Sequence, residues 1–333
     1  MRDLWIKRMI SKMVMIGFRG EELPQWFVEQ VKKYSPGGII LFGSNISSPV
    51  QLGELIKDLR RCCSEPVLIA VDQEGGKVSR LKPENGFFPL PSAAQIGEKN
   101  DSAFAKRLYQ AVSKELSDLG INCNLAPVVD LAINPENQVI VKLGRSFGRS
   151  AKKVIKYARI FCDALHEKGI ISVLKHFPGH GSSFEDSHDG FVDISKTWDP
   201  EELKPYRVLI REGRAKMIMT AHVFNKRLDS HYPATLSYAI IKKLLRDSLG
   251  FKGVVISDDM QMKAITDHYL LSEAVTLAVN AGVNMLLFTN QQKSISLEDI
   301  VEVMYEELKN GNIKLEDIVE SNRMIQGVLK NAL

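Results

Sequence analysis

Eight short apolar runs are spread along this chain, with helix-like stretches between them. The runs are rich in Val, Ile, Leu and Met and do not alternate cleanly with polar residues. Such continuous runs are typical of parallel strands that are buried on both faces. We place the eight predicted strands at Met13–Phe18, Gly38–Phe42, Val67–Val71, Asn122–Val129, Ser172–His176, Met217–His222, Val254–Asp258 and Met285–Phe288.

Apolar residues at helical spacing lie between these runs and predict amphipathic helices. Asp199 followed by Pro200 predicts a further helix start, because Asp caps a helix and Pro suits its first position. Gly250 and Gly282 stand where helices tend to stop. The predicted helices are Gln51–Cys62, Ala151–Glu167, Ser237–Leu249 and Ser272–Ala281.

Eight strands alternating with helices over 333 residues predict an α/β fold, a single (β/α)8 TIM-type barrel. We expect one domain over residues 1–333, with the C-terminal helices from about 291 to 333 packed on the barrel. A doubly wound open sheet is the alternative, but it would not need eight units. The sequence has no Gly-rich phosphate loop after any strand, which argues against a nucleotide-binding fold.

Composition and charge exclude several classes of protein. The 44 basic and 40 acidic residues are mixed along the chain, without basic runs interleaved with aromatics, so we expect no nucleic-acid partner. Four cysteines without CxxC spacing are expected to be reduced thiols. Lys12 interrupts the apolar N-terminal stretch, and no run is long enough to span a membrane. We therefore expect a cytoplasmic protein with no membrane contact, acting as a monomer.

Polar residues collect at the ends of five predicted strands. In a barrel enzyme, the carboxyl ends of the strands carry the chemistry. One such Asp would be explained as a helix cap, whereas five polar strand ends together predict an active site. These strand ends are Asp72-Gln73-Glu74, Asp130, the segment Lys175–Gly181, His222 and Asp258-Asp259.

Asp258 closes an apolar run, so its carboxylate should be at least half-buried and should need a partner or a substrate. Its neighbour Asp259 could equally cap the next helix. Because adjacent strand residues point in opposite directions, one of the two should face the barrel mouth. The sequence leaves open which one does.

Asp186 and His188 flank a single serine in the loop after the fifth strand. In an extended segment they project to the same side, where a carboxylate would hold one imidazole tautomer and stabilise its protonated form. This pair predicts a general acid/base. The alternative is an Asx-turn beside an exposed histidine.

His176 and His180 have a spacing that binds metal on a helix, but Pro178 and Gly179 lie between them and disfavour a helix. We therefore expect no metal site, and we interpret Lys175-His176 as hydrogen-bonding groups for polar substrate atoms. Arg80 and Arg145 could each form a surface ion pair or clamp a substrate.

Several of these segments resemble the bacterial β-N-acetylglucosaminidases of glycoside hydrolase family 3. The strongest is KHFPGHGSSFEDSH at Lys175–His188, which is similar to the family's KHFPGHG…DSH signature. The segments Gly38–Phe42, Val71–Arg80 and Ser257–Met260 match as well. The resemblance covers nearly the whole chain.

The resemblance implies roles for eight residues and requires no metal or organic cofactor. It implies that Asp258 is the nucleophile, that His188 is the general acid/base and that Asp186 is its partner. It also implies that five side chains hold the hydroxyl and N-acetyl groups of the sugar, namely Asp72, Arg80, Arg145, Lys175 and His176.

The implied activity is a retaining exo-β-N-acetylglucosaminidase that works through a covalent glycosyl-Asp258 intermediate. The chain is similar to the single-domain enzymes of cell-wall recycling, which act in the cytoplasm on N-acetylglucosamine joined to 1,6-anhydro-N-acetylmuramic acid, with or without peptide. Because a neutral histidine base does not repel phosphate, a family 3 phosphorylase is one alternative. The others are a non-catalytic sugar-binding barrel, a family 3 β-glucosidase or xylosidase, and a barrel aldolase using Lys175.

Overall fold

The computed structural model describes residues 2–184 and 190–330, and within them eight parallel strands close into one barrel. The strands follow the order β1-β12-β11-β9-β7-β6-β3-β2, so the predicted (β/α)8 barrel is confirmed. Their bounds are β1 (Val14–Gly17), β2 (Gly38–Leu41), β3 (Leu68–Val71), β6 (Cys123–Asn124), β7 (Ile171–Phe177), β9 (Met217–Thr220), β11 (Val254–Asp259) and β12 (Met285–Phe288).

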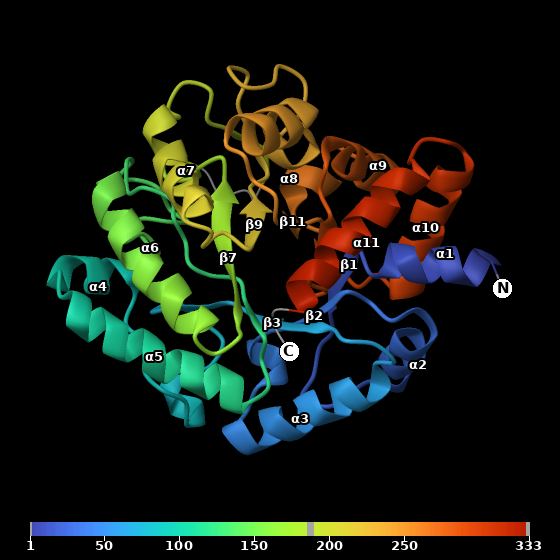
Figure 1. Cartoon of the computed structure of the whole chain (residues 1–333), viewed down its shortest axis with the longest axis horizontal. Coiled ribbons are helices and arrows are strands. Elements are labelled where there is room, and N and C mark those ends of the chain that lie inside the picture. The colour runs from blue at the N-terminus through green and yellow to red at the C-terminus, as the bar shows by residue number, and fades with distance from the viewer. Residues whose placement is uncertain (1, 185–189, 331–333) are drawn as a thin grey trace.

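Helices surround the barrel, and Figure 1 shows α3, α5, α6 and α7 succeeding one another around its wall. The first helix, α1, packs against α10 and α11, so the first helix of the chain lies beside the last two. The helices are α1 (Arg2–Ser11), α2 (Gln25–Tyr34), α3 (Pro49–Cys62), α4 (Ala93–Lys99), α5 (Ser102–Asp118), α6 (Ala151–His166), α7 (Lys204–Arg211), α8 (Lys263–Thr266), α9 (Leu271–Ala281), α10 (Leu297–Lys309) and α11 (Leu315–Leu329).

Helix boundaries follow the capping residues of the sequence. The Asp199 side chain accepts a hydrogen bond from the Glu201 amide as predicted, but the turn Pro200–Leu203 is a 3-10 helix before α7 begins. Gly282 ends α9 with φ +104°. The helix predicted from Ser237 is a π-helix, η5 (Ala239–Ser248). Over so short a segment, apolar spacing does not distinguish it from an α-helix.

The fourth barrel strand is much shorter than the predicted Asn122–Val129, because only β6 pairs regularly on both sides. Pro127 has no amide proton to donate to a ladder, and Val128 makes only an isolated bridge to Lys175. The Asn124 Oδ1 instead accepts the amide of Gln73 at 3.0 Å. A side chain thus replaces backbone pairing where β3 ends.

Two small sheets sit among the loops that follow the barrel strands. The hairpin of β4 (Gln73–Gly75) and β5 (Val78–Ser79) follows β3, and β8 (Val192–Asp193) pairs with β10 (Val223–Phe224). Gly75 has φ +108°, and a Cβ there would lie 2.2 Å from the carbonyl oxygen of Pro91. This turn therefore needs glycine.

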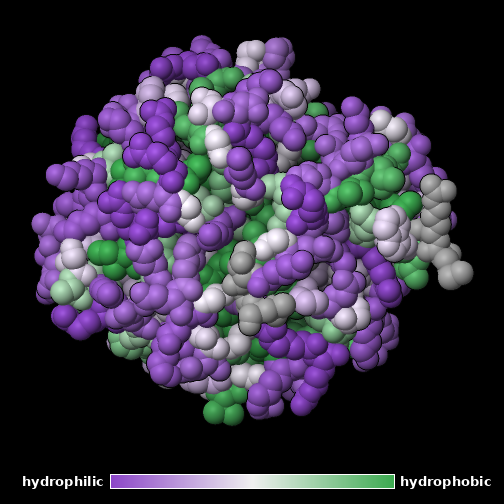
Figure 2. Space-filling model, in the orientation of Figure 1, coloured by the Kyte–Doolittle hydropathy of each residue, from purple (hydrophilic) through white to green (hydrophobic). Residues whose placement is uncertain are grey.

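The barrel strands and the inward faces of the helices form the core, and the face shown in Figure 2 is mainly hydrophilic. All four cysteines are free, as expected for reduced thiols, with Cys123 and Cys162 buried. In the part of the chain that the structure describes, no helix combines the length and apolarity that a membrane span requires.

Candidate active site

A cavity of about 250 Å³ opens at the carboxyl ends of the barrel strands. Six of the eight predicted site residues line it, so the fold brings together groups from three strand ends and two loops. These are Asp72, Arg80, Arg145, Lys175, His176 and Asp258. The predicted acid/base pair, Asp186 and His188, lies outside the described residues.

Lys175 is the centre of the charged groups in this cavity. It is buried on β7, and its Nζ lies 2.8 Å from the Asp72 Oδ1 and 2.7 Å from the Glu74 Oε1. Burial acts to lower the pKa of the Lys175 ammonium, but the two carboxylates raise it overall. Lys175 therefore stays charged, which argues against the aldolase alternative, because a Schiff-base lysine needs a lowered pKa.

Arg145 and Glu74 form a buried, two-pronged ion pair. The Arg145 Nε and Nη2 donate to the two Glu74 carboxylate oxygens at 2.8 and 2.9 Å. Burial acts to raise the pKa of Glu74, yet the charges of Arg145 and Lys175 lower it overall. Glu74 is thus an anion that fixes the guanidinium in one orientation.

Asp72 is held in the same way by two cations. Its second oxygen accepts from the Arg80 Nη2 at 3.1 Å, and the Arg80 guanidinium lies 4.7 Å from the Phe42 ring centroid. Burial acts to raise the pKa of Asp72, but Lys175 and Arg80 hold it well below its usual range. The Gln73 Oε1 accepts the amide of Arg80 at 3.0 Å, which fixes the position of the Arg80 backbone.

His176 is fixed on both ring nitrogens. Its Nδ1 lies 2.7 Å from the Asp130 Oδ2, and its Nε2 lies 3.2 Å from the Arg145 Nη2. Because a guanidinium only donates, Nε2 must accept, and Nδ1 carries the proton that is shared with Asp130. His176 is therefore neutral in this arrangement.

Asp130 also accepts the amide of His180 at 2.9 Å, so it joins β7 to the loop that follows this strand. Burial acts to raise the pKa of Asp130, but its interactions with His176 and His180 lower it. Burial lowers the pKa of His180 to about 4, and its Nδ1 lies 2.7 Å from the Ser183 Oγ. His180 is thus neutral near pH 7.

Asp258 and Asp259 both line the cavity, and their partners separate their roles. The Asp259 carboxylate accepts from the Thr289 hydroxyl at 2.5 Å and from the amides of Gln261 and Thr289 at 3.1 and 3.3 Å. Asp258 accepts the amide of Asp259 at 2.8 Å. Asp259 thus ties β11 to the residues after β12, which leaves Asp258 as the nucleophile candidate of the pair.

Asp258 and Asp72 come from opposite sides of the barrel, whereas Lys175, on β7, is separated from β11 by β9 alone. In the closed strand order, three strands separate β3 from β11 in either direction. Asp72 follows β3, whereas Asp258 lies on β11. A ligand in this cavity would meet both the fixed charged hydrogen-bonding groups and the carboxylate of Asp258.

The family model described as "Glycosyl hydrolase family 3 N terminal domain" matches residues 6–328. The chain belongs to glycoside hydrolase family 3. The resemblance noted in the sequence is confirmed, and so is the expectation of a glycoside hydrolase on a barrel of this kind.

Two β-hexosaminidases are similar to this chain along most of its length. The chain is 36% identical over 284 residues to a β-hexosaminidase of Tolumonas auensis, and the match covers 84% of this chain and 83% of that protein. It is 32% identical over 332 residues to β-hexosaminidase A of Pseudoalteromonas piscicida. That match covers 93% of this chain and 54% of the relative, so the chain spans about half the length of that protein.

Solved family 3 structures share the fold closely. The β-N-acetylglucosaminidase of Paenibacillus sp. has a TM-score of 0.92 at 32% identity, over 98% of this chain and 62% of that chain. The β-N-acetylhexosaminidase of Beutenbergia cavernae has a TM-score of 0.90 at 26% identity, over 98% of both chains.

Three further polar residues of this family 3 site were not assigned a role from the sequence. Glu74 pairs with Arg145 and Lys175, Asp130 orients His176, and His180 lines the cavity. Glu74 stands two residues from Asp72, so the same-side rule for extended segments would have linked them. Asp130 was recognised only as a polar strand end.

A fourth residue, Glu202, lies outside the cavity and supports the loop after β7. It is fully buried, and its Oε2 accepts the amide of Gly181 at 2.8 Å. Gly179 has φ +122°, and a Cβ there would lie 2.6 Å from that of Glu202. Burial raises the pKa of Glu202 to about 8, with Asp130 adding to the effect. No sequence motif marked this residue.

Proposed function

We propose that this chain is a retaining exo-β-N-acetylglucosaminidase with Asp258 as its nucleophile. The observation that carries the proposal is that Asp258 lines the same cavity as the cluster formed by Lys175, Arg145 and their carboxylates. Fixed charged donors and acceptors suit the hydroxyl and N-acetyl groups of a sugar. The buried Arg80 Nε has no hydrogen-bond partner among the described residues, which leaves one donor for a ligand.

The protonation states of the cavity support a general acid supplied by the segment around His188. A retaining enzyme needs an acid that is protonated near neutral pH. Asp72 and Glu74 have lowered pKa values, and His180 titrates at about 4. Burial raises the pKa of Asp259, but its carboxylate is occupied by Thr289 and Gln261. None of these four described groups therefore suits the role of general acid.

The proposed reaction has two displacements. An oxygen of Asp258 attacks the anomeric carbon, the glycosidic C–O bond breaks, and His188 gives its proton to the leaving oxygen. Asp186 favours the protonated imidazole. In the second step neutral His188 takes a proton from water, the water oxygen bonds to the anomeric carbon, and the bond to Asp258 breaks. Two inversions retain the β configuration.

The proposed substrates are peptidoglycan fragments in which terminal N-acetylglucosamine is joined to 1,6-anhydro-N-acetylmuramic acid, with or without peptide. The setting would be cell-wall recycling in the cytoplasm. A cavity of about 250 Å³ supports exo action on one sugar, because sites for drug-sized ligands have roughly 300–1,000 Å³. The substrate class rests on the family resemblance, including the similarity to β-hexosaminidases.

The test is hydrolysis of 4-nitrophenyl β-N-acetylglucosaminide and the matching β-glucoside, each with and without phosphate. We expect phosphate-independent release from the N-acetyl substrate alone, and we expect Asp258→Asn to abolish it. The matched control is Asp267→Asn, which changes an exposed residue directly after α8 and should retain activity. Strict phosphate dependence would instead identify a phosphorylase, and silence from folded protein would favour a sugar-binding barrel.

His188→Ala tests the acid role separately. Aryl substrates with good leaving groups need little protonation, so the variant should lose less activity on them than on alkyl glycosides. An equal loss on both classes would contradict the assignment of His188.

A further inference from the structure

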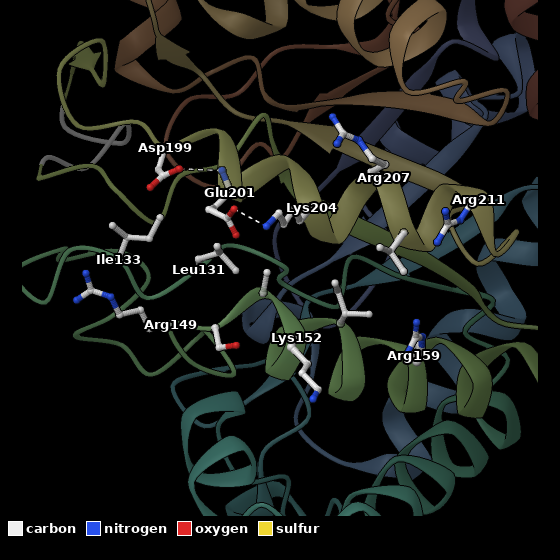
Figure 3. A pocket seen from close by; sticks show the side chains of 14 residues that line it. Leu131, Ile133, Arg149, Lys152, Arg159, Asp199, Glu201, Lys204, Arg207 and Arg211 are labelled. Atoms are coloured by element: carbon white, nitrogen blue, oxygen red, sulfur yellow. Dashed lines mark hydrogen bonds and ion pairs between the residues drawn. The ribbon is translucent and has the colours of Figure 1, made fainter.

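A second hollow, of about 760 Å³, lies on the outside of the barrel between α6 and α7. Figure 3 shows its two walls, with Lys152 and Arg159 on α6, and Arg207 and Arg211 on α7. We call it the α6–α7 groove. Residues that line it include six basic side chains, namely Arg149, Lys152, Arg159, Lys204, Arg207 and Arg211.

The groove concentrates positive charge. Its lining holds six basic residues and two acidic ones, Asp199 and Glu201, so the excess is four charges, as large as the net +4 of the whole chain. The Asp199 side chain accepts the amide of Glu201, and Glu201 pairs with Lys204 at 2.5 Å. Both carboxylates are thus already engaged at one end of the groove.

Four cations of the groove have no such partner. Arg159 pairs with Glu212 at 2.8 Å, but Arg149, Lys152, Arg207 and Arg211 form no hydrogen bond or ion pair with another described residue. All four are exposed. Like charges held close together repel, so a groove of unpaired cations favours binding of an anion.

The cations form rows along the two helices. Arg207 and Arg211 are four residues apart on α7, and Lys152 and Arg159 are seven apart on α6, so each pair shares one helix face. The first turn of α6 also lines the groove, and its cap residue Ser150 makes no side-chain cap. Its amide groups add to the positive field at that end. Rows of charge fit a linear ligand with repeated anionic groups.

The floor of the groove selects between kinds of anionic chain. It contains Leu131, Ile133, Ile155 and Val208, and among the described lining residues none is aromatic. Nucleic-acid grooves rely on aromatic rings that stack with bases. An aliphatic strip between basic walls instead fits a peptide that carries carboxylates and short apolar side chains.

We propose that the α6–α7 groove binds a carboxylate-bearing peptide. One chain segment links the groove to the active site, because Leu131 lines the groove while the preceding residue, Asp130, holds His176. The occupant that its charge fits is a separate acidic polypeptide, and the peptide part of a substrate is the alternative that the turnover test below detects.

Binding of a free peptide tests the groove without any catalysis. The probe is a fluorescein-labelled peptide of alternating Glu and Ala, measured by fluorescence anisotropy at low ionic strength. We expect Arg207→Ala with Arg211→Ala to weaken binding about tenfold. The matched control, Lys106→Ala with Arg107→Ala on α5, removes two exposed cations and should change it by less than about twofold.

Three results would overturn the proposal. They are equal weakening in the two double variants, equally tight binding of a probe with Gln in place of Glu, and tighter binding of oligothymidylate of the same charge. Absence of any binding to the Glu peptide at low ionic strength would also overturn it, because screening is then weakest.

Turnover identifies the source of the peptide. If the α7 double variant lowers kcat/KM for a peptide-bearing disaccharide but not for the peptide-free one, the peptide belongs to the substrate. If both values stay unchanged while free-peptide binding is lost, the partner is a separate acidic chain. Failure of the wild-type protein to hydrolyse any substrate would refute the proposed function and leave the peptide-binding result standing.

Discussion

The active-site cavity and the α6–α7 groove are both rich in arginine and lysine, but they use these side chains differently. In the cavity, Lys175 is 2% exposed and Arg145 is 9% exposed, and each is locked to carboxylates. In the groove, Arg207 and Arg211 are exposed and lack such partners. Burial makes pairing obligatory in the cavity, because an unpaired buried charge is strongly unfavourable. The cavity can therefore hold its hydrogen-bonding groups in fixed orientations toward a ligand, whereas the groove attracts an anionic ligand through its net positive charge.

The largest expected difference concerns removal of a cation from the cavity. Lys175→Met would leave Asp72 and Glu74 short of a shared partner, and we expect the free energy of unfolding to fall by about 3–5 kcal/mol at neutral pH. Urea denaturation followed by circular dichroism measures it. The loss should shrink at mildly acidic pH, because the orphaned carboxylates then take up protons.

Lys57→Met is the matched control for Lys175→Met. Lys57 forms an exposed ion pair with Glu54 on α3, and such pairs contribute at most about 1 kcal/mol. A similar effect of the two substitutions would contradict the distinction between buried and exposed cations.

The second prediction concerns Glu202, whose pKa is raised from its ordinary 4.5 to about 8. Between these values the folded state binds the proton more tightly than the unfolded state. The protonated carboxyl therefore contributes stability that is fully present below about pH 4.5 and is lost as the pH rises through about 8. Glu202→Gln cannot ionise, so its stability should fall less than that of the wild type between about pH 5 and pH 9, by about 4 kcal/mol.

Thermal or urea unfolding of both proteins across this pH range measures the Glu202 effect. Because Asp130 and Asp199 face Glu202 in both proteins, the difference between the two profiles isolates Glu202 itself. Parallel profiles would show that Glu202 does not titrate in this range.

The smallest expected effect is a gain in the free energy of unfolding, and it concerns Arg207 in the α6–α7 groove. Arg207 has Lys204 three residues before it and Arg211 four residues after it on α7. Arg207→Gln removes this like-charge repulsion, so we expect a gain of about 0.2–0.5 kcal/mol. Differential scanning calorimetry at low ionic strength checks it. A loss above about 1 kcal/mol would mean that Arg207 is paired in solution.

Much of the fold and site could be predicted because one periodicity determines both. Eight apolar runs give the eight barrel strands, and polar residues at their ends, such as Asp72 and Asp258, then meet at one mouth. The five predicted sugar-binding residues all line the cavity. That they contact sugar, and that Asp258 is the nucleophile, stay predictions.

The features that the sequence did not give depend on tertiary packing. Pro127 shortens the fourth strand because its missing amide proton breaks the ladder, while Asn124 restores pairing from a side chain. Glu202 is distant from every motif, and only folding brings it under Gly181. Of the pair Asp258 and Asp259, the partner Thr289 distinguishes the two, and it comes from another strand end.

The seam of the barrel has a consequence for how the chain is made. Val14 of β1 aligns with Leu286 of β12, and α1 packs against α10 and α11. During synthesis, β1 leaves the ribosome long before its partner does, so one edge of the growing sheet stays open until β12 emerges. Contacts between such distant residues slow folding. The barrel therefore cannot close in the nascent chain until β12 has emerged.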